Sequence, residues 1–340
     1  MDLELSEEQD QLVHTLSTVF AKACSTESVR ACEPLGFDPG LWRQLVEFGL
    51  VAMAVAEEDG GGGATLLDLA LASEAAGRRI APVPVVEAVV TARLLARAGA
   101  PASALLTDAL TSSESLTLAL RPAVEGRCRL VPAGAIATVV VGLDGDDLVA
   151  VTAPPPGDAP ANIASAPISD RSLRDADRVV LASHPNAVAL HEHAVAEWKS
   201  LTAAQLTGLA AGTLEMAVEY AKVREQFGVP IGSFQALAHR LADAATAIDG
   251  CRLLALEAAW SADEAPDDFG RLASMAFAWA AETAADAAAE NLHIHGGMGF
   301  SVEGDAQLYF RRATGWPKAL HGIHREYQVL ADLLYGPAGS

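Results

Sequence analysis

The stretch Arg224-Glu-Gln-Phe-Gly-Val-Pro-Ile-Gly-Ser-Phe-Gln235 lies between two long helical patterns and decides how the whole chain is interpreted. An arginine beside a glycine turn at the end of a helix can present its guanidinium to a diphosphate. Further along, His293-Ile-His-Gly-Gly-Met-Gly-Phe300 closes another helical pattern with paired glycines. Bare backbone N–H groups at such glycines can also approach an anion closely. The two phrases together predict a site for a diphosphate group.

Regular apolar spacing on both sides of the first phrase predicts long helices. On the C-terminal side the apolar residues recur at three- and four-residue steps, at Leu237, Leu241, Ala244, Ile248, Cys251 and Ala255. Such spacing puts one apolar stripe on one face of a helix. A similar pattern runs from Leu206 to Tyr220, and an Ala-rich stretch runs from Arg271 to Leu292. Long helices with short connections indicate a four-helix bundle.

The remainder of the chain predicts a second helical region and a small β module. Residues 1–113 have helical patterns that open with the capping box Ser6-Glu-Glu-Gln9. After Ser115 come short β-type runs separated by turn residues, at Leu116–Leu120, Ala135–Val141, Leu148–Val151 and Arg178–Leu181. We therefore expect a mainly α chain with a small β domain. Its parts are an N-terminal helical domain (1–113), a reduced middle β domain (114–185) and a C-terminal helical bundle (186–340).

Composition and charge exclude several classes of function. The net charge of −21 repels nucleic acid and anionic lipid, so neither is expected as a partner. Charged residues interrupt every apolar run before it could cross a bilayer. The acidic first residues are unlike a secretory signal, and we expect a cytoplasmic protein. No Cys-x-x-Cys pair occurs among the four cysteines, which predicts reduced thiols.

The order, spacing and helical context of the two phrases resemble the FAD signature of the acyl-CoA dehydrogenase family. The sequence of helical, β and helical regions is similar to the layout of that family as well. The resemblance covers nearly the whole chain, and is strongest from Val223 onward and weakest between residues 115 and 185. It implies the acyl-CoA dehydrogenase fold, an FAD cofactor and an acyl-CoA substrate. Electron-transfer flavoprotein is the electron acceptor that it implies.

The resemblance also implies which residues contact the cofactor: Arg224, Gln226, Phe227, Ile231, Gln235, His293, Gly296 and Gly297. Arg224 would hold the pyrophosphate, and Gln235 would form a hydrogen bond with the cofactor. In this family such contacts reach a flavin seated mainly on the neighbouring subunit, so FAD binding would require a dimer. The pair His293 and His295 could suggest a metal, but two ligands without a nearby carboxylate are too few, and no metal site is expected.

The catalytic base is missing from both positions where the family carries a glutamate. The loop at residues 311–322 contains no acidic side chain. Trp198 occupies the alternative position, with Glu197 one step before it. A slip of one residue turns a helical side chain by about 100°. Glu197 and His321, which falls in the region of the active-site loop, are the candidates for a substitute base.

The phrases that hold the isoalloxazine ring in the family are missing too. Leu116-Thr-Leu-Ala-Leu-Arg-Pro122 stands in the place of the first, and nothing recognisable stands in the place of the second. The half of the signature for the adenine dinucleotide is thus present without the half for the ring. This pattern is similar to the shorter, non-catalytic subunits of bacterial heterotetrameric acyl-CoA dehydrogenases. Those complexes oxidise CoA thioesters of steroid side chains or ring fragments.

Three hypotheses follow. In the first, the chain is one half of an FAD-dependent acyl-CoA dehydrogenase, and a paralogous subunit supplies the glutamate. In the second, it is a self-sufficient homodimeric enzyme of the same family with an unusual base. In the third, it is a scaffold that stabilises a partner and contacts no flavin.

Overall fold

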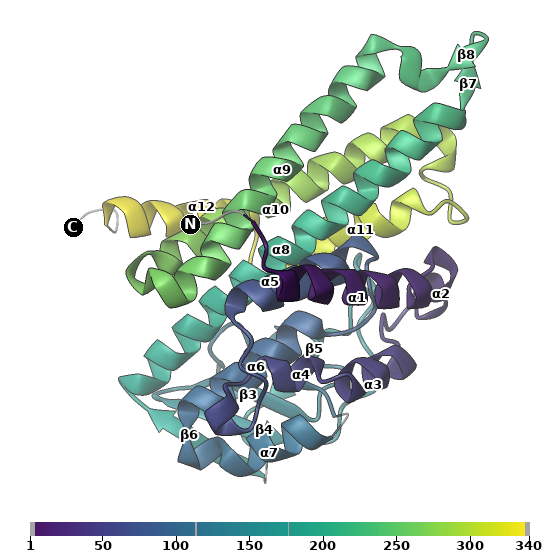
Figure 1. The fold of residues 1–340 in the computed structure, drawn as a ribbon. Coiled ribbons are helices and arrows are strands. Elements are labelled where there is room, and N and C mark those ends of the chain that lie inside the picture. Colours follow the sequence, from purple (N-terminus) through teal and green to yellow (C-terminus); the bar gives the residue numbers. More distant parts are fainter. Residues whose placement is uncertain (1–3, 113, 176, 337–340) are drawn as a thin grey trace. The chain divides into compact units, whose positions relative to one another are not determined.

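The computed structural model describes residues 4–112, 114–175 and 177–336, and most of these are helical (Figure 1). The helices of the N-terminal third are α1 (Glu7–Ala23), α2 (Thr26–Ala31), α3 (Pro39–Glu47), α4 (Leu50–Met53), η1 (Glu57–Asp59), α5 (Leu66–Arg78), α6 (Val85–Ala98), η2 (Ala100–Ala102) and α7 (Ser103–Thr111). The predicted capping box is confirmed at the start of α1. Backbone N–H of Gln9 donates to Ser6 Oγ, and backbone N–H of Ser6 donates to Gln9 Oε1.

The chain folds into two compact units, each built from stretches that are not adjacent in sequence. The first contains the described residues of 1–31, 70–81 and 200–340, and the second contains those of 32–69 and 82–199. Helix α5 contributes residues to both units, and so does a later helix, α8 (Asn186–Val223). The three consecutive domains expected from the sequence remain a prediction. The two compact units do not follow those boundaries, because each combines stretches from different parts of the sequence.

The second unit contains the β module. Its strands are β1 (Leu116–Leu118), β2 (Arg127–Val131), β3 (Val139–Asp144), β4 (Asp147–Thr152), β5 (Ser169–Ser172) and β6 (Arg178–Ser183). Four of them form a sheet in the order β1-β3-β4-β6, in which β1 is parallel to β3 and the other neighbours are antiparallel. Strands β2 and β5 form a separate antiparallel pair.

Strand β5 has no counterpart among the expected β-type runs, because its sequence Ser-Asp-Arg-Ser has no apolar residue. Tertiary contacts hold it in place. The buried guanidinium of Arg171 donates to the carbonyl oxygens of Gly134, Ala137 and Ala153, at 2.8, 2.6 and 3.3 Å. One side chain therefore satisfies three backbone acceptors around the β module, which a sequence pattern does not reveal.

The first unit contains the helical bundle. After α8 come β7 (Glu225–Gln226), β8 (Val229–Pro230), η3 (Ile231–Ser233), α9 (Gln235–Glu264), α10 (Pro266–His295), η4 (Gly296–Met298), α11 (Ala306–Gly315), η5 (Trp316–Ala319) and α12 (Ile323–Tyr335). Helices α9 and α10 run antiparallel and side by side (Figure 1). The mainly helical fold with a small sheet is thus as expected.

Glycines bring α5 and α8 close together within this unit. A Cβ atom added to Gly208 would lie 1.9 Å from the carbonyl oxygen of Glu74, and one added to Gly77 would lie 1.8 Å from that of Gln205. Both helices therefore approach with bare backbone at the contact, a geometry that any larger side chain would prevent.

Candidate functional site

The two glycine-containing phrases meet at one end of the bundle. The ring of Tyr220, near the end of α8, stacks on the ring of His295, at the end of α10, with centroids 4.1 Å apart. Ile231 and Ile294 belong to one buried apolar cluster with two alanines of α8. The strands β7 and β8 form a hairpin beyond α8 at this end (Figure 1). The structure therefore joins segments far apart in sequence into one surface, which we call the hairpin end (residues 220–235 and 293–300).

The turn of the hairpin holds a bulky residue in an unfavourable backbone conformation. Phe227 has a φ of 55° and Gly228 a φ of 79°. Two-residue hairpin turns with positive φ at both positions favour Asn-Gly, and a bulky residue there is uncommon. The Phe227 side chain is 93% exposed, and its ring lies edge-to-face with that of Phe234, with centroids 6.1 Å apart. This backbone strain presents an aromatic ring to solvent, a feature that accompanies ligand contact more often than packing.

The hairpin end also contains a positive charge and an uncapped helix N-terminus. The main chain of Arg224 is fixed by hydrogen bonds to Tyr220 and Ile231. Its exposed guanidinium forms no ion pair with any residue in the described part of the chain. No side chain caps the N-terminus of α9, which begins at Gln235. A guanidinium and an uncapped helix N-terminus both favour phosphate oxygens.

Packing explains one of the glycines at the end of α10 but not the others. A Cβ atom on Gly299 would lie 2.6 Å from the carbonyl oxygen of Leu292, so packing explains that glycine. Gly296 has a φ of 58°, but a Cβ atom there or on Gly297 would meet no atom within 4 Å. Packing within this chain therefore does not explain Gly297. The open space above both residues suits a ligand that approaches the backbone.

The other expected contact residues differ in their exposure. His293 and Gln226 are exposed, and the amide of Gln226 donates to the carbonyl oxygen of Glu225. Ile231 is buried in the apolar cluster of the hairpin end, where its observed role is packing. Its contact with a cofactor stays a prediction. Tyr220 and His295 were not expected as site residues, and no local pattern identifies a stack between two helices.

Glu197 is a fully buried carboxylate in an ionic cluster of the second unit, and its cationic partners are partly exposed. Its Oε1 lies 2.8 Å from Arg97, 3.0 Å from Arg93 and 3.4 Å from His193. Burial alone would raise the pKa of Glu197, but the hydrogen bond from His193 and the two arginine charges outweigh it and lower the pKa to about 2. A carboxylate that is inaccessible and held ionised is a poor proton acceptor. We therefore do not propose Glu197 as the base.

His321 lies between η5 and α12 and has a carboxylate partner. Its Nε2 is 2.5 Å from Oε2 of Glu326, a fully buried side chain on α12. Residues 311–322, expected as a loop, form the end of α11, η5 and the turn before α12, and they contain no acidic side chain. The fold brings a carboxyl group to His321 from Glu326, five residues downstream. A histidine held by a carboxylate is a common arrangement for a general base. Sequence reasoning missed Glu326 because it lies beyond the loop.

Trp198, at the alternative base position, is buried against α6. Its indole Nε1 lies 3.3 Å from Glu87 Oε1, to which it donates a hydrogen bond. Burial raises the pKa of Glu87. An aromatic ring thus fills the position and pairs with a carboxyl group from another helix.

The segment at 116–120, in the place of the first ring-binding phrase, packs inside the β module. Thr117 donates to the carbonyl oxygen of Pro132 at 2.5 Å, and the His191 ring lies 2.8 Å from the carbonyl oxygen of Ala119. All five side chains of the segment are buried. They are engaged in the interior of the second unit and do not line its surface.

The described residues contain no group of three or more His, Cys, Asp or Glu side chains arranged to hold a metal ion. None of the helices in this part of the chain combines the length and the apolar character needed to cross a bilayer.

Two protein-family models match the chain. The model described as "Acyl-CoA dehydrogenase, N-terminal domain" matches residues 6–104, and the model described as "Acyl-CoA dehydrogenase, C-terminal domain" matches residues 194–316. A similar curated protein is the acyl-CoA dehydrogenase IpdE2 of Mycobacterium tuberculosis. It is 33% identical over 91% of this chain and 92% of that protein.

Two solved structures contain similar chains. A chain of the ChsE4-ChsE5 complex from Mycobacterium tuberculosis is 29% identical, with a TM-score of 0.86 over 99% of this chain and 100% of that chain. A chain of the Tcur3481-Tcur3483 steroid ACAD is 28% identical, also with a TM-score of 0.86, over 98% of this chain and 99% of that chain. Both structures carry the names of two proteins, and the one from Mycobacterium tuberculosis is described as a complex.

Proposed function

Because the chain belongs to the acyl-CoA dehydrogenase family, we propose that it is one half of a heteromeric, FAD-dependent enzyme that introduces an α,β double bond into an acyl-CoA thioester. One observation carries the proposal. The hairpin end has the features of a dinucleotide site, whereas neither base position carries a glutamate: residues 311–322 contain no acidic side chain, and Trp198 fills the alternative position beside Glu197, which is held in an ionic cluster. A paralogous subunit then supplies the catalytic glutamate and the surface for the flavin ring.

In this proposal several residues of the hairpin end contact the cofactor. The Arg224 guanidinium binds the pyrophosphate charge of FAD, which matters in a chain with a net charge of −21. Gly296 and Gly297 leave room for the dinucleotide above the end of α10. Phe227 offers a fixed ring surface for contact, and Gln235 lies at the N-terminus of α9. When bound, FAD supplies the acceptor for the hydride that leaves the β-carbon.

The substrate that we propose for the complex is a CoA thioester of a steroid side chain or ring fragment. It is supported by the similarity to chains of complexes, one of which is described as a steroid acyl-CoA dehydrogenase. Electron-transfer flavoprotein as acceptor and a cytoplasmic location belong to the same proposal. The expected assembly is a heterotetramer with two copies of each subunit.

The test is co-expression of this chain with its paralogous subunit from the same genome. We expect a yellow complex with acyl-CoA dehydrogenase activity, and a colourless, inactive product from this chain alone. Arg224→Ala should reduce the flavin retained by the purified complex about tenfold or more, since it removes a charge-assisted contact with the pyrophosphate.

Lys222→Ala is the matched control. Lys222 is an exposed cation two residues away whose charge pairs with Glu219 at 2.7 Å, so the flavin content should not change. Absorbance of the visible flavin bands per mole of complex measures both variants. Full flavin content in the Arg224→Ala complex would refute this role and favour a scaffold that contacts no flavin.

The contact between His321 and Glu326 favours a second candidate function, a self-sufficient homodimer. In that case the His321 ring accepts the substrate's α-proton while Glu326 orients it. Flavin bound to the chain alone, with activity that His321→Asn abolishes, would favour this candidate over the heteromeric one. Inactivity of the chain alone together with activity of the complex would exclude it.

A further inference from the structure

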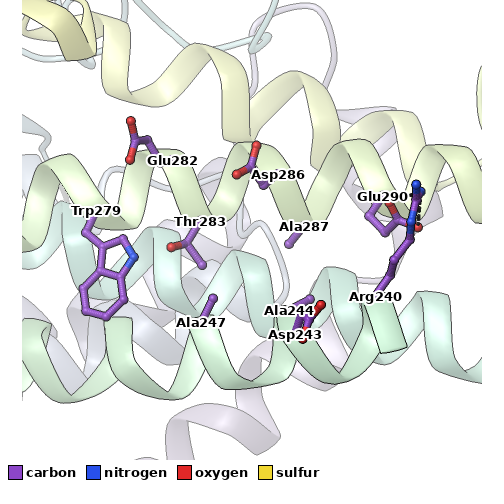
Figure 2. A pocket seen from close by; sticks show the side chains of 10 residues that line it. All are labelled: Arg240, Asp243, Ala244, Ala247, Trp279, Glu282, Thr283, Asp286, Ala287 and Glu290. Carbon is purple, nitrogen blue, oxygen red and sulfur yellow. Dashed lines mark hydrogen bonds and ion pairs between the residues drawn. The ribbon is translucent and has the colours of Figure 1, made fainter. Parts of the chain in front are cut away.

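A groove of about 350 Å³ runs between α9 and α10 within the bundle unit (Figure 2). Its floor consists of small side chains, Ala244, Ala247, Thr283 and Ala287. Trp279 stands at one end and the ion pair of Arg240 with Glu290 at the other (Figure 2). We call this feature the α9–α10 groove. Small side chains on its floor allow another element to approach both helix backbones closely.

Trp279 forms a fixed wall of the groove. A Cβ atom on Gly250 would lie 2.7 Å from Cη2 of the indole, so the ring packs directly over the backbone of α9. The side chain nevertheless remains 39% exposed. A rigid, half-exposed tryptophan beside a hollow is the type of residue that contributes most to protein interfaces.

The rims of the groove carry an excess of negative charge. Arg240 neutralises Glu290 through two contacts, at 3.0 and 3.2 Å. Three more carboxylates line the groove: exposed Asp243 on α9, and exposed Glu282 and Asp286 on α10. Neither Asp243 nor Asp286 forms an ion pair within the described part of the chain. Glu282 accepts a hydrogen bond from Tyr327, a neutral donor.

We propose that the α9–α10 groove receives a helix of the paralogous subunit that carries Lys or Arg side chains along its contacting face. The inference rests on the proposed heteromeric function. Charge complementarity argues for a cationic occupant, because carboxylates on both rims attract cations and disfavour a neutral or acidic segment. The straight channel between two helices and its alanine floor suit a third helix, which packs at about 8–10 Å from its neighbours when the contact residues allow it.

A second copy of this chain fits the groove poorly. If the grooves of two copies faced each other, the unpaired carboxylates of both would be brought together. Each copy also carries a net charge of −21. Like charges face to face are a common device against wrong pairing. The groove also starts beside the hairpin end, since Arg240 follows Gln235 by little more than one turn and Glu290 precedes Gly296 by less than two. One partner could therefore cover both surfaces.

The test reverses two charges in the full chain and measures assembly with the paralogous subunit. In the double variant Asp243→Lys, Asp286→Lys, the dissociation constant of the complex should rise about tenfold or more. Raising the salt from about 0.1 M to about 1 M shortens the screening length from about 10 Å to about 3 Å, and should weaken the wild-type complex much more than the variant. Sedimentation of the purified proteins measures both effects.

Two controls separate the groove from net charge and from folding. The double variant Asp249→Lys, Asp263→Lys changes the net charge by the same amount at exposed positions of α9 that do not line the groove, and should assemble like the wild type. Ala247→Leu fills the floor without changing charge and should weaken assembly as well. Circular dichroism of each chain alone verifies that the fold is retained.

The outcomes distinguish this inference from the proposed function. A yellow wild-type complex whose affinity is unchanged by the charge reversal and by Ala247→Leu overturns the inference and leaves the proposed function intact. A homodimer of this chain alone that the charge reversal dissociates also overturns it, in favour of a second copy. Failure of the wild-type chains to form a complex overturns both. Weaker assembly only in the groove variants supports it.

Discussion

At the scale of single residues, Phe227 in the hairpin end adopts a strained backbone conformation that lowers stability beside the proposed ligand site. Phe227 adopts a φ of 55° with its ring 93% exposed, so it gains little from burial while its backbone is strained. Such strain costs about 1 kcal/mol or more. Natural proteins retain such strain mainly at residues whose side chains contact a ligand or a partner. A substitution at Phe227 can therefore distinguish the contribution of its side chain to ligand binding from its contribution to folding stability.

Replacing Phe227 with asparagine should raise stability and lower flavin retention at once. Asn-Gly is the preferred pair for this turn, so Phe227→Asn should stabilise the chain by about 1 kcal/mol. Urea unfolding of the chain alone measures the gain, and flavin absorbance of the complex measures the loss of the aromatic contact. Gly228→Ala is the comparison, and its φ of 79° predicts destabilisation by about 1 kcal/mol. Unchanged flavin content in Phe227→Asn would contradict a role of the ring in binding.

At the scale of helices and strands, close backbone contacts and buried polar groups hold elements that are distant in sequence. Gly208 on α8 faces Glu74 on α5, and Arg171 on β5 satisfies carbonyl groups of neighbouring loops. Neither contact involves a large apolar side chain. The positions of these elements therefore depend on a few residues whose importance is not visible in hydrophobic patterns.

Gly208→Ala should destabilise the contact between α5 and α8. Alanine favours a helix over glycine by about 1 kcal/mol, but a methyl group 1.9 Å from a carbonyl oxygen forces the helices apart. We expect a net loss of about 2 kcal/mol. Gly270→Ala on α10 is the matched control, since its Cβ atom would meet nothing within 4 Å, and it should be neutral or stabilising. Thermal unfolding of both variants measures the difference. Equal midpoints would show that the contact adjusts without cost.

At the scale of the whole molecule, the chain carries an excess of negative charge, and one of its carboxylates, Glu197, is buried beside two arginines. Lowering the pH neutralises surface carboxylates and relieves repulsion in a chain with a net charge of −21. The cluster of Glu197 with Arg93 and Arg97 acts in the opposite direction, because its carboxylate must stay ionised to balance two guanidinium groups. Stability in acid therefore depends on the balance of these two effects.

The cluster predicts a loss of stability below pH 4.5. The folded-state pKa of Glu197 is lowered to about 2 from 4.5, so the unfolded chain binds more protons between these values. The contribution is fully present above pH 4.5 and is lost as the pH falls toward 2, with a size of about 3 kcal/mol. Glu197→Gln should remove this pH dependence and lower stability at pH 7 by about 3 kcal/mol. Urea unfolding at several pH values tests it, and an unchanged acid limb in Glu197→Gln would disprove it.

The sequence by itself determined the helical regions, the start of α1 and the family, because these depend on residues close together in the chain. Apolar spacing, the Ser6 capping box and the phrases after Arg224 and His293 are such local signals. Only the tertiary structure decided that Tyr220 stacks on His295, that Glu197 is enclosed by cations and that His321 meets Glu326. Those contacts depend on how helices pack. Helix packing depends on the surfaces of all neighbouring elements together, so no local sequence pattern specifies these contacts.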